Sequence, residues 1–169
     1  MDDIAALVEP HIPALRRYAW ALLRNDDAAD DLVQDCLERA ISRWHLRRTD
    51  GNLRAWLFTI LRNQFISGVR HKATRGTQVP LDDYAPGLGT AATQEAQLIA
   101  RDALAGLDAL PEEQRSVLLL VGVEDLSYEE AARVLDVPVG TVMSRLSRGR
   151  ERLRQFMETG RTTAIRRIK

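Results

Sequence analysis

Residues 139–154 (VGTVMSRLSRGRERLR) contain arginine at five of sixteen positions. On a helix of about 3.6 residues per turn, apolar residues share one side of this segment, while the opposite side carries Ser144, Arg145, Arg148 and Arg152. A guanidinium group binds phosphate oxygens, or the acceptor edge of guanine, through paired hydrogen bonds. The spacing therefore predicts a helix with one face in a core and the other face on an anionic partner.

The residues before this segment predict how the helix is held. Ser127 and Glu130 have the spacing of a capping box, so a helix should begin there, and the Ala131-Ala132 pair permits close approach of a second helix. Asp136-Val137-Pro138 then interrupts the pattern before the basic segment begins. Two short helices joined by such a turn, the second with a basic outer face, are typical of a helix-turn-helix, whose second helix enters the DNA major groove.

The expected DNA contacts of this second helix are of two kinds. Free backbone N–H groups at Gly140 and Thr141 suit a phosphate, because the helix dipole favours an anion there. Near the helix start, the side chains that can reach base edges are Ser144, Arg145 and Arg148. Deeper along the helix, the residues expected to neutralise phosphates are Arg150, Arg152 and Arg154.

The formal net charge of the 169-residue chain is zero, but the charges are unevenly distributed. Residues 101–135 hold eight acids and three arginines, whereas residues 136–169 hold nine basic and three acidic side chains. An isolated charged helix is more often a solvated face than a binding site. The coincidence of a cap, small residues, a turn and a basic face nevertheless favours a DNA-binding helix.

Helical periodicity without any strand pattern predicts an all-α protein of two small domains. Helices are expected over 11–24, 27–44 and 53–72, and the stretch 73–93 is rich in Gly, Pro, Thr and Asp, as in a flexible linker. Pro111 suits the first residue of a further helix. The predicted divisions are an N-terminal domain (1–72), the linker (73–93), a helix-turn-helix domain (94–158) and a tail (159–169).

The cysteine content and the length of the apolar runs indicate the cellular compartment in which the protein is expected. Cys36 is a lone cysteine, which excludes an internal disulfide and a multi-cysteine metal site. The longest apolar run, Val117 to Val123, is too short to span a bilayer, and no targeting segment is visible. We expect a cytoplasmic protein without membrane insertion.

Three strings go beyond such general patterns: VPVGTVMSRLSRGRERL within residues 110–154, DAADDLVQDCLERAI (27–41) and AWLFTILRN (55–63). The first resembles the C-terminal DNA-binding domain of bacterial extracytoplasmic-function (ECF) sigma factors of the sigma-70 family. The other two are similar to the N-terminal promoter-melting domain of the same family. The resemblance implies a sigma factor that directs core RNA polymerase to specific promoters, with the helix-turn-helix on the minus-35 element, under control of an anti-sigma factor.

For the N-terminal domain, the resemblance implies two binding surfaces. One would dock on the clamp coiled coil of the polymerase large subunit, and its candidates are Asp31, Gln34, Asp35 and Glu38. A large-subunit flap of core polymerase is a further expected contact. The other would hold the displaced strand of the minus-10 element, with the candidates Arg47, Arg48, Asn52, Thr59, Arg62, Asn63 and Arg70. Trp44 and Trp56 are possible stacking platforms, although Trp56 suits the core better.

Other functional classes leave no clear trace in the sequence. His11, His45 and His71 lie on separate segments without the spacing of metal ligands, and no catalytic motif is present. We expect no enzyme, no metal, no cofactor and no small-molecule substrate. Two alternatives remain: a stand-alone helix-turn-helix regulator, and a sigma mimic that titrates an anti-sigma factor.

Overall fold

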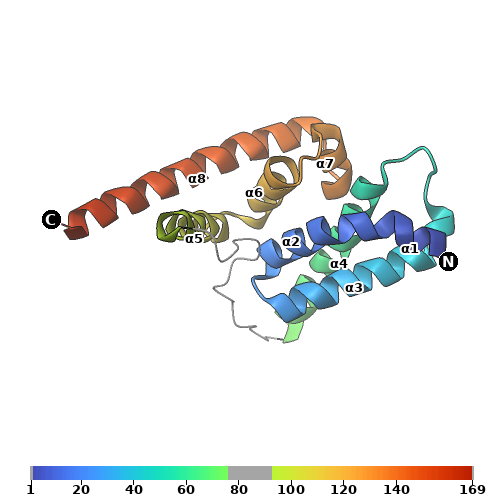
Figure 1. Ribbon diagram of the computed structural model, residues 1–169. Helices are drawn as coiled ribbons and strands as arrows, with labels where there is room; N and C mark the ends of the chain where they lie inside the picture. Colours follow the sequence, from blue (N-terminus) through green and yellow to red (C-terminus); the bar gives the residue numbers. More distant parts are fainter. Residues whose placement is uncertain (1, 76–92, 169) are drawn as a thin grey trace.

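A computed structural model describes residues 2–75 and 93–168, with side chains described for 3–71 and 93–160. The predicted linker lies almost entirely outside the described residues. Within them all regular structure is helical, so the all-α prediction is confirmed (Figure 1). The elements are α1 (Asp2–Val8), η1 (Glu9–His11), α2 (Ile12–Leu23), α3 (Asp26–Ser42), η2 (Trp44–Leu46), α4 (Leu53–Arg75), α5 (Gln94–Asp108), α6 (Glu112–Val117), η3 (Leu118–Val123), α7 (Tyr128–Leu135) and α8 (Val139–Ile168).

Helices α2, α3 and α4 form the N-terminal bundle, with α3 packed against both of its neighbours. Its centre holds Tyr18 and Phe58, which meet edge to face with ring centroids 5.4 Å apart. The expected break between the first two predicted helices is confirmed, because the Asn25 side chain accepts from the backbone N–H of Ala28 at 2.9 Å and caps α3. The short helices α1, η1 and η2 were not predicted.

Helix α8 is the axis of the C-terminal bundle and contacts α5, α6 and α7. Val142 and Leu146 are buried on its inner face. Two glycines allow the helices to approach closely: a Cβ on Gly106 of α5 would lie 2.6 Å from Leu153, and one on Gly149 of α8 would lie 3.1 Å from Leu118. The side of α8 that faces the core is therefore determined by the close fit of these glycines against neighbouring side chains as well as by the hydropathy of its residues.

The predicted capping box is present at the start of α7. The Ser127 hydroxyl accepts from the Glu130 backbone N–H at 3.1 Å, and the Glu130 carboxylate accepts from the Ser127 backbone N–H at 2.9 Å. Asp136 ends α7 in the left-handed region (φ 53°), a conformation that aspartate tolerates better than most residues, and α8 begins at Val139. Pro111 is the N-cap residue, immediately before α6 (Glu112–Val117), and not the first residue of that helix as predicted.

The segment η3 is a π-helical turn that the sequence did not indicate. The backbone N–H of Glu124 donates to the carbonyl of Leu119, five residues earlier, at 2.9 Å, and the next residue, Asp125, has φ 54°. The chain then continues into the cap of α7. The turn leaves the Glu124 side chain only 1% exposed, although a carboxylate is rarely buried without a partner.

The two bundles pack against each other, which the prediction of two tethered domains did not include. Helix α4 lies along α7, and α2 meets η3 (Figure 1). Arg24, at the end of α2, approaches Asp108 of α5 at 3.8 Å. Polar side chains from both bundles meet in this interface.

Loss of the Leu146 side chain tests how α8 is held. Leu146→Ala removes a buried side chain from the centre of the C-terminal bundle, so we expect the free energy of unfolding to fall by about 2–4 kcal/mol. Met143→Ala, on the same helix but 52% exposed, should change it by less than about 0.5 kcal/mol. Denaturant unfolding of both variants measures the difference, and equal losses would contradict this packing.

Candidate nucleic-acid interface

The outer face of α8 presents most of the predicted DNA-binding residues to solvent. Val142 and Leu146 point into the bundle, whereas the predicted DNA-binding residues that are exposed are Gly140, Ser144, Arg148, Arg150 and Arg152. Thr141 is half-buried, and its carbonyl accepts from the Ser144 hydroxyl at 3.1 Å. The helix thus has a core side and a cationic side, as its sequence predicts.

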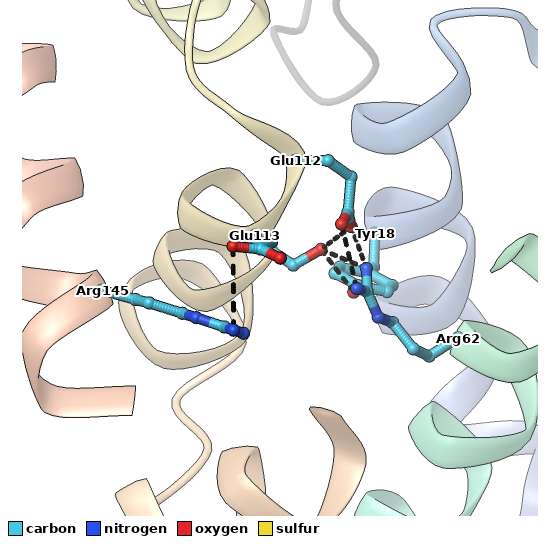
Figure 2. Close-up of polar contacts among 6 residues, drawn as sticks. Tyr18, Arg62, Glu112, Glu113 and Arg145 are labelled. Carbon is cyan, nitrogen blue, oxygen red and sulfur yellow. Dashed lines mark hydrogen bonds and ion pairs between the residues drawn. The ribbon is translucent and has the colours of Figure 1, made fainter. Parts of the chain in front are cut away.

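Two arginines of α8 are engaged by nearby acids. The side chain of Arg145 is 23% exposed, and its Nη2 lies 3.7 Å from Oε2 of Glu113 in α6 (Figure 2). Arg154 forms surface ion pairs at 2.7 Å with Glu151 and Glu158 of its own helix. Arg148 therefore has a more accessible guanidinium than its neighbour Arg145.

The loop before α4 carries the first part of the predicted single-strand site. The Arg47 guanidinium lies 4.7 Å from the ring centroid of Trp44, and that ring meets Trp56 edge to face at 6.1 Å. Trp56 is half-buried against the core, as expected. Arg48 is exposed and lies 3.4 Å from Asp50.

Asn52 has two structural roles at the end of this loop. Its Oδ1 accepts from the backbone N–H of Ala55 at 3.3 Å and so helps to start α4. Its amide nitrogen donates to the carboxylate of Glu130 in α7. Asn52 therefore links the loop to the helix-turn-helix.

The predicted residues on α4 itself differ in accessibility. Asn63 and Arg70 are exposed, while Thr59 is half-buried and its hydroxyl donates to the carbonyl of Ala55 at 2.9 Å. Arg62 is only 9% exposed. All four residues lie on α4. Thr59, Asn63 and Arg70 are at least partly exposed, whereas Arg62 is buried in the interface between the bundles.

Arg62 is held by a network from three helices. Its guanidinium donates to both carboxylate oxygens of Glu112, the longer of these contacts being 3.1 Å, and to the Ser116 hydroxyl at 2.6 Å. That hydroxyl donates to Glu112 at 2.7 Å and accepts from Tyr18 at 3.4 Å. Figure 2 shows Glu112 directed at Arg62 and the adjacent Glu113 directed at Arg145. Neighbouring acids of α6 thus engage arginines of two predicted DNA-binding helices.

The charge of Glu112 is stabilised by this network. Burial raises the pKa of Glu112, but hydrogen bonds from Arg62 and Ser116, with the charges of Arg62 and Arg115, lower it by more, so the pKa lies below its ordinary value. A carboxyl group with a lowered pKa stabilises the fold above its unfolded pKa and loses that contribution as the pH falls through its folded pKa. The contact therefore persists at neutral pH and weakens only in acid.

A second network, which sequence reasoning missed, surrounds Glu124. Arg17 of α2 donates to both of its carboxylate oxygens, each at 2.8 Å, and Arg54 of α4 donates to the carboxylate at 3.1 Å and to the backbone carbonyl at 2.7 Å. The acid lies 107 residues from Arg17 in the chain, so no local pattern connects them. In the sequence, the one feature that could have indicated this network is the position of Glu124 directly after the apolar run Val117 to Val123.

The residues expected to contact polymerase lie together on α3. Asp31, Gln34, Asp35 and Glu38 are all exposed, and Gln34 donates to Glu38 at 3.3 Å. The two aspartates border a groove of about 270 Å³ between α3 and α4. Its apolar lining includes Leu23, Leu32, Phe65 and Val69.

Within the described parts of the chain, no cluster of His, Cys, Asp and Glu side chains has the arrangement of a metal site. In the same residues, no helix has the length and hydropathy that a bilayer crossing requires.

Comparison with known proteins gives the family. Residues 8–62 match the description "Sigma2 domain of PhyR", and residues 101–153 match "Sigma-70, region 4". Over 152 residues the chain is 44% identical to the ECF RNA polymerase sigma factor EcfG of Rhodopseudomonas palustris, covering 90% of this chain and 81% of that one. The protein belongs to the ECF sigma factors. Helix α8 falls within the region 4 match as far as residue 153.

Solved structures resemble this ECF sigma factor over most of its length. The sigma factor RpoE of Bartonella quintana, in complex with the anti-sigma factor NepR, is 32% identical with a TM-score of 0.82, covering 94% of this chain and 98% of that one. The anti-anti-sigma factor PhyR of the same organism, also complexed with NepR, has a TM-score of 0.59 at 16% identity, covering 89% of this chain and 49% of that one. The second likeness concerns the fold alone.

The cysteine of this sigma factor should be chemically inert in the folded state. Cys36 is fully buried, its thiol donates to the carbonyl of Leu57 at 3.5 Å, and burial raises its pKa to about 12. Reaction requires the thiolate, so a disulfide reagent at pH 8 should modify Cys36 only after denaturant unfolds the chain. Ellman's assay on native and unfolded protein checks this. Rapid stoichiometric labelling of native protein would contradict it.

Proposed function

We propose that this ECF sigma factor recognises the minus-35 promoter element with α8 in the major groove. The single observation that carries the proposal is the exposed cationic face of α8, on which Ser144 and Arg148 are exposed while Val142 and Leu146 anchor the helix. Gly140 and Thr141 at the helix start are the proposed phosphate contacts, as are Arg150 and Arg152 further along. Arg145 is proposed to reach base edges together with Ser144 and Arg148 once its guanidinium leaves Glu113.

The N-terminal bundle is proposed to hold the single-stranded minus-10 element. An unpaired strand needs cationic and polar groups for its backbone and flat surfaces for its bases. The Arg47–Trp44 stack and the exposed Asn63 and Arg70 meet this need. The remaining proposed residues of this surface are Arg48, Asn52, Thr59 and Arg62.

Core polymerase is proposed to bind α3. The exposed acidic face with Asp31 and Asp35, next to an apolar groove, suits a basic coiled coil such as the clamp of the large subunit, and Gln34 and Glu38 extend that face. A large-subunit flap of core polymerase is the proposed partner of the C-terminal bundle. The proposed divisions are 1–72, 73–93, 94–158 and 159–169, and the matches to residues 8–62 and 101–153 fall within the two domains.

An anti-sigma factor is the proposed regulator. The related RpoE, similar over 94% of this chain, was solved with the anti-sigma factor NepR. A polypeptide that covers α3 or α8 would compete with polymerase or DNA for the same charged faces. Since promoters and polymerase reside in the bacterial cytoplasm, we place the protein there, and its role requires no catalysis of its own.

A sigma mimic is the second candidate, because residues 8–62 match the sigma2 domain of PhyR, which is described as an anti-anti-sigma factor. A mimic needs no DNA-binding helix, whereas α8 keeps four exposed arginines between residues 145 and 155. The sigma function is therefore favoured.

Transcription in vitro distinguishes these functions. Core polymerase and this protein are incubated with a library of promoter fragments, and run-off transcripts are sequenced. A sigma factor gives transcripts that start at a common distance from a shared pair of elements. Duplex binding without initiation would favour a stand-alone regulator. Absence of both duplex binding and initiation would favour the mimic.

The role of Arg148 as a reader of bases has its own test. Arg148→Ala should weaken binding of the holoenzyme to its preferred minus-35 element by about 1–3 kcal/mol and relax selection at one base pair, because a bidentate contact to guanine is lost. Arg152→Ala, one turn further along, removes a proposed phosphate contact and should weaken all sequences alike. Competition binding to a randomised minus-35 library measures both, and uniform loss for Arg148→Ala would contradict base readout.

A further inference from the structure

A cavity of about 330 Å³ lies where the end of α2 meets α5. It is lined by Arg24, which directly follows α2, and by Arg101, Ala105 and Asp108 of α5. Two guanidinium groups and one carboxylate border it, so the lining carries a net positive charge. Small-molecule sites occur preferentially between domains and have volumes from about 300 Å³ upward. The size and charge of this cavity therefore suit a small polyatomic anion.

Arg24 has hydrogen-bonding groups that its neighbours do not satisfy. Its side chain is only 9% exposed, and among the described residues neither Nε nor Nη1 has a hydrogen-bond partner. The guanidinium packs on the ring of Trp20, with Cζ 4.5 Å from the ring centroid. Charged donors that are buried without an acceptor cost free energy, because they have lost their hydration. An anion in the adjoining cavity would supply the acceptor.

Asp108, the acid that lines the cavity, lies too far away to be that acceptor. Its Oδ2 is 3.8 Å from Nη1 of Arg24, and its Oδ1 is 4.0 Å from Nη1 of Arg115, whose Nε is also buried without a partner. Hydrogen bonds from a guanidinium to a carboxylate measure about 2.7–2.9 Å. One carboxylate is thus shared by two guanidinium groups and hydrogen-bonds neither, and Arg101 adds a third positive charge.

The two arginines of the lining lie at different depths. Arg24 is more than nine-tenths buried, whereas Arg101 is exposed to solvent. A phosphate in a nucleic-acid strand is flanked on both sides by sugars and bases, which hinders its entry into a recess between helices. A free anion has no such flanks. The burial of Arg24 therefore favours a small ligand that reaches from the recess to the surface.

We propose that this cavity binds a small anion with two linked phosphate groups, a diphosphate, and that Arg24 and Arg101 are its ligands. One phosphate pairs with Arg24 in the recess and the other with Arg101 toward solvent, each through the paired N–H groups of a guanidinium. The inference goes beyond promoter recognition and does not require it. Because the ligand binds side chains of α2 and α5 together, its binding adds to the stability of the folded chain.

The test is isothermal titration calorimetry of the full chain with inorganic pyrophosphate, in magnesium-free buffer at an ionic strength held constant with sodium chloride. We expect one site with a Kd below about 1 mM, and a melting temperature that rises as pyrophosphate is added. Arg101→Gln should weaken binding by about tenfold or more, because one phosphate loses its paired donors. Arg101 is exposed, so this variant should fold like the wild type.

Matched controls separate the site from net charge. Arg133→Gln removes the same charge at an exposed arginine of α7 and should change the Kd by less than about twofold. Asp108→Asn removes the carboxylate that repels the ligand and should tighten binding by about fivefold or more. Glu95→Gln, at an exposed acid of the same helix, should have less than about a twofold effect.

Two results would overturn the proposal. One is the absence of both saturable heat and a rise in melting temperature up to about 10 mM pyrophosphate. The other is equal weakening by Arg101→Gln and Arg133→Gln, because binding would then follow net charge and not the cavity.

ADP distinguishes the two sources of a diphosphate, because it carries the same pair of phosphates on a nucleoside. ADP that binds at least as tightly as pyrophosphate identifies nucleoside diphosphates as the ligand class. Weaker binding of ADP identifies the inorganic anion. Either result, with the expected loss in Arg101→Gln, supports the site.

Discussion

Burial of the Glu124 carboxylate between Arg17 and Arg54 is the interaction on which the arrangement of the two bundles depends. A carboxylate that is 1% exposed requires charged partners, and here both come from the other bundle. The π-helical turn at Leu118–Val123 and the left-handed Asp125 direct the side chain there. An irregular stretch of backbone thus places the Glu124 carboxylate where it joins the two bundles.

Helix α8 illustrates how one segment serves packing on one side and presents arginines to solvent on the other. Gly149 allows α8 to lie close to Leu118, which fixes the rotation of the helix about its axis. That rotation determines which arginines face solvent. Arg148 faces solvent, whereas Arg145 is partly withdrawn toward Glu113, so adjacent turns of one helix differ in how readily they reach DNA.

Features that depend on neighbours in the chain could be predicted from the sequence. The Ser127–Glu130 capping box, the turn at Asp136 and the apolar side of α8 are encoded within a few residues, and the structure contains all three. The exposed α3 face follows from the same periodicity. The family resemblance then supplied roles for residues whose charge alone is ambiguous.

Features that depend on contacts between distant segments could not be predicted. Arg62 has the composition and position of a DNA-binding residue, yet its burial follows from Glu112, 50 residues away. Arg17 and Arg54 gave no signal because a surface arginine and a paired arginine look alike in sequence. The π-helical turn could not be predicted because an apolar run fits an α-helix equally well.

The central claim is that the contacts of Arg17 and Arg54 with the buried Glu124 hold the two bundles of the protein in one arrangement. Spin labels at Ser42→Cys and Gln155→Cys, both exposed and in different bundles, report the separation of α3 and α8 by pulsed electron paramagnetic resonance, while buried Cys36 stays unlabelled. The account predicts one narrow distance distribution for the protein with Glu124 intact and a broader or longer one when Glu124→Gln removes the charge that Arg17 and Arg54 contact. The same distribution with and without Glu124→Gln would contradict it.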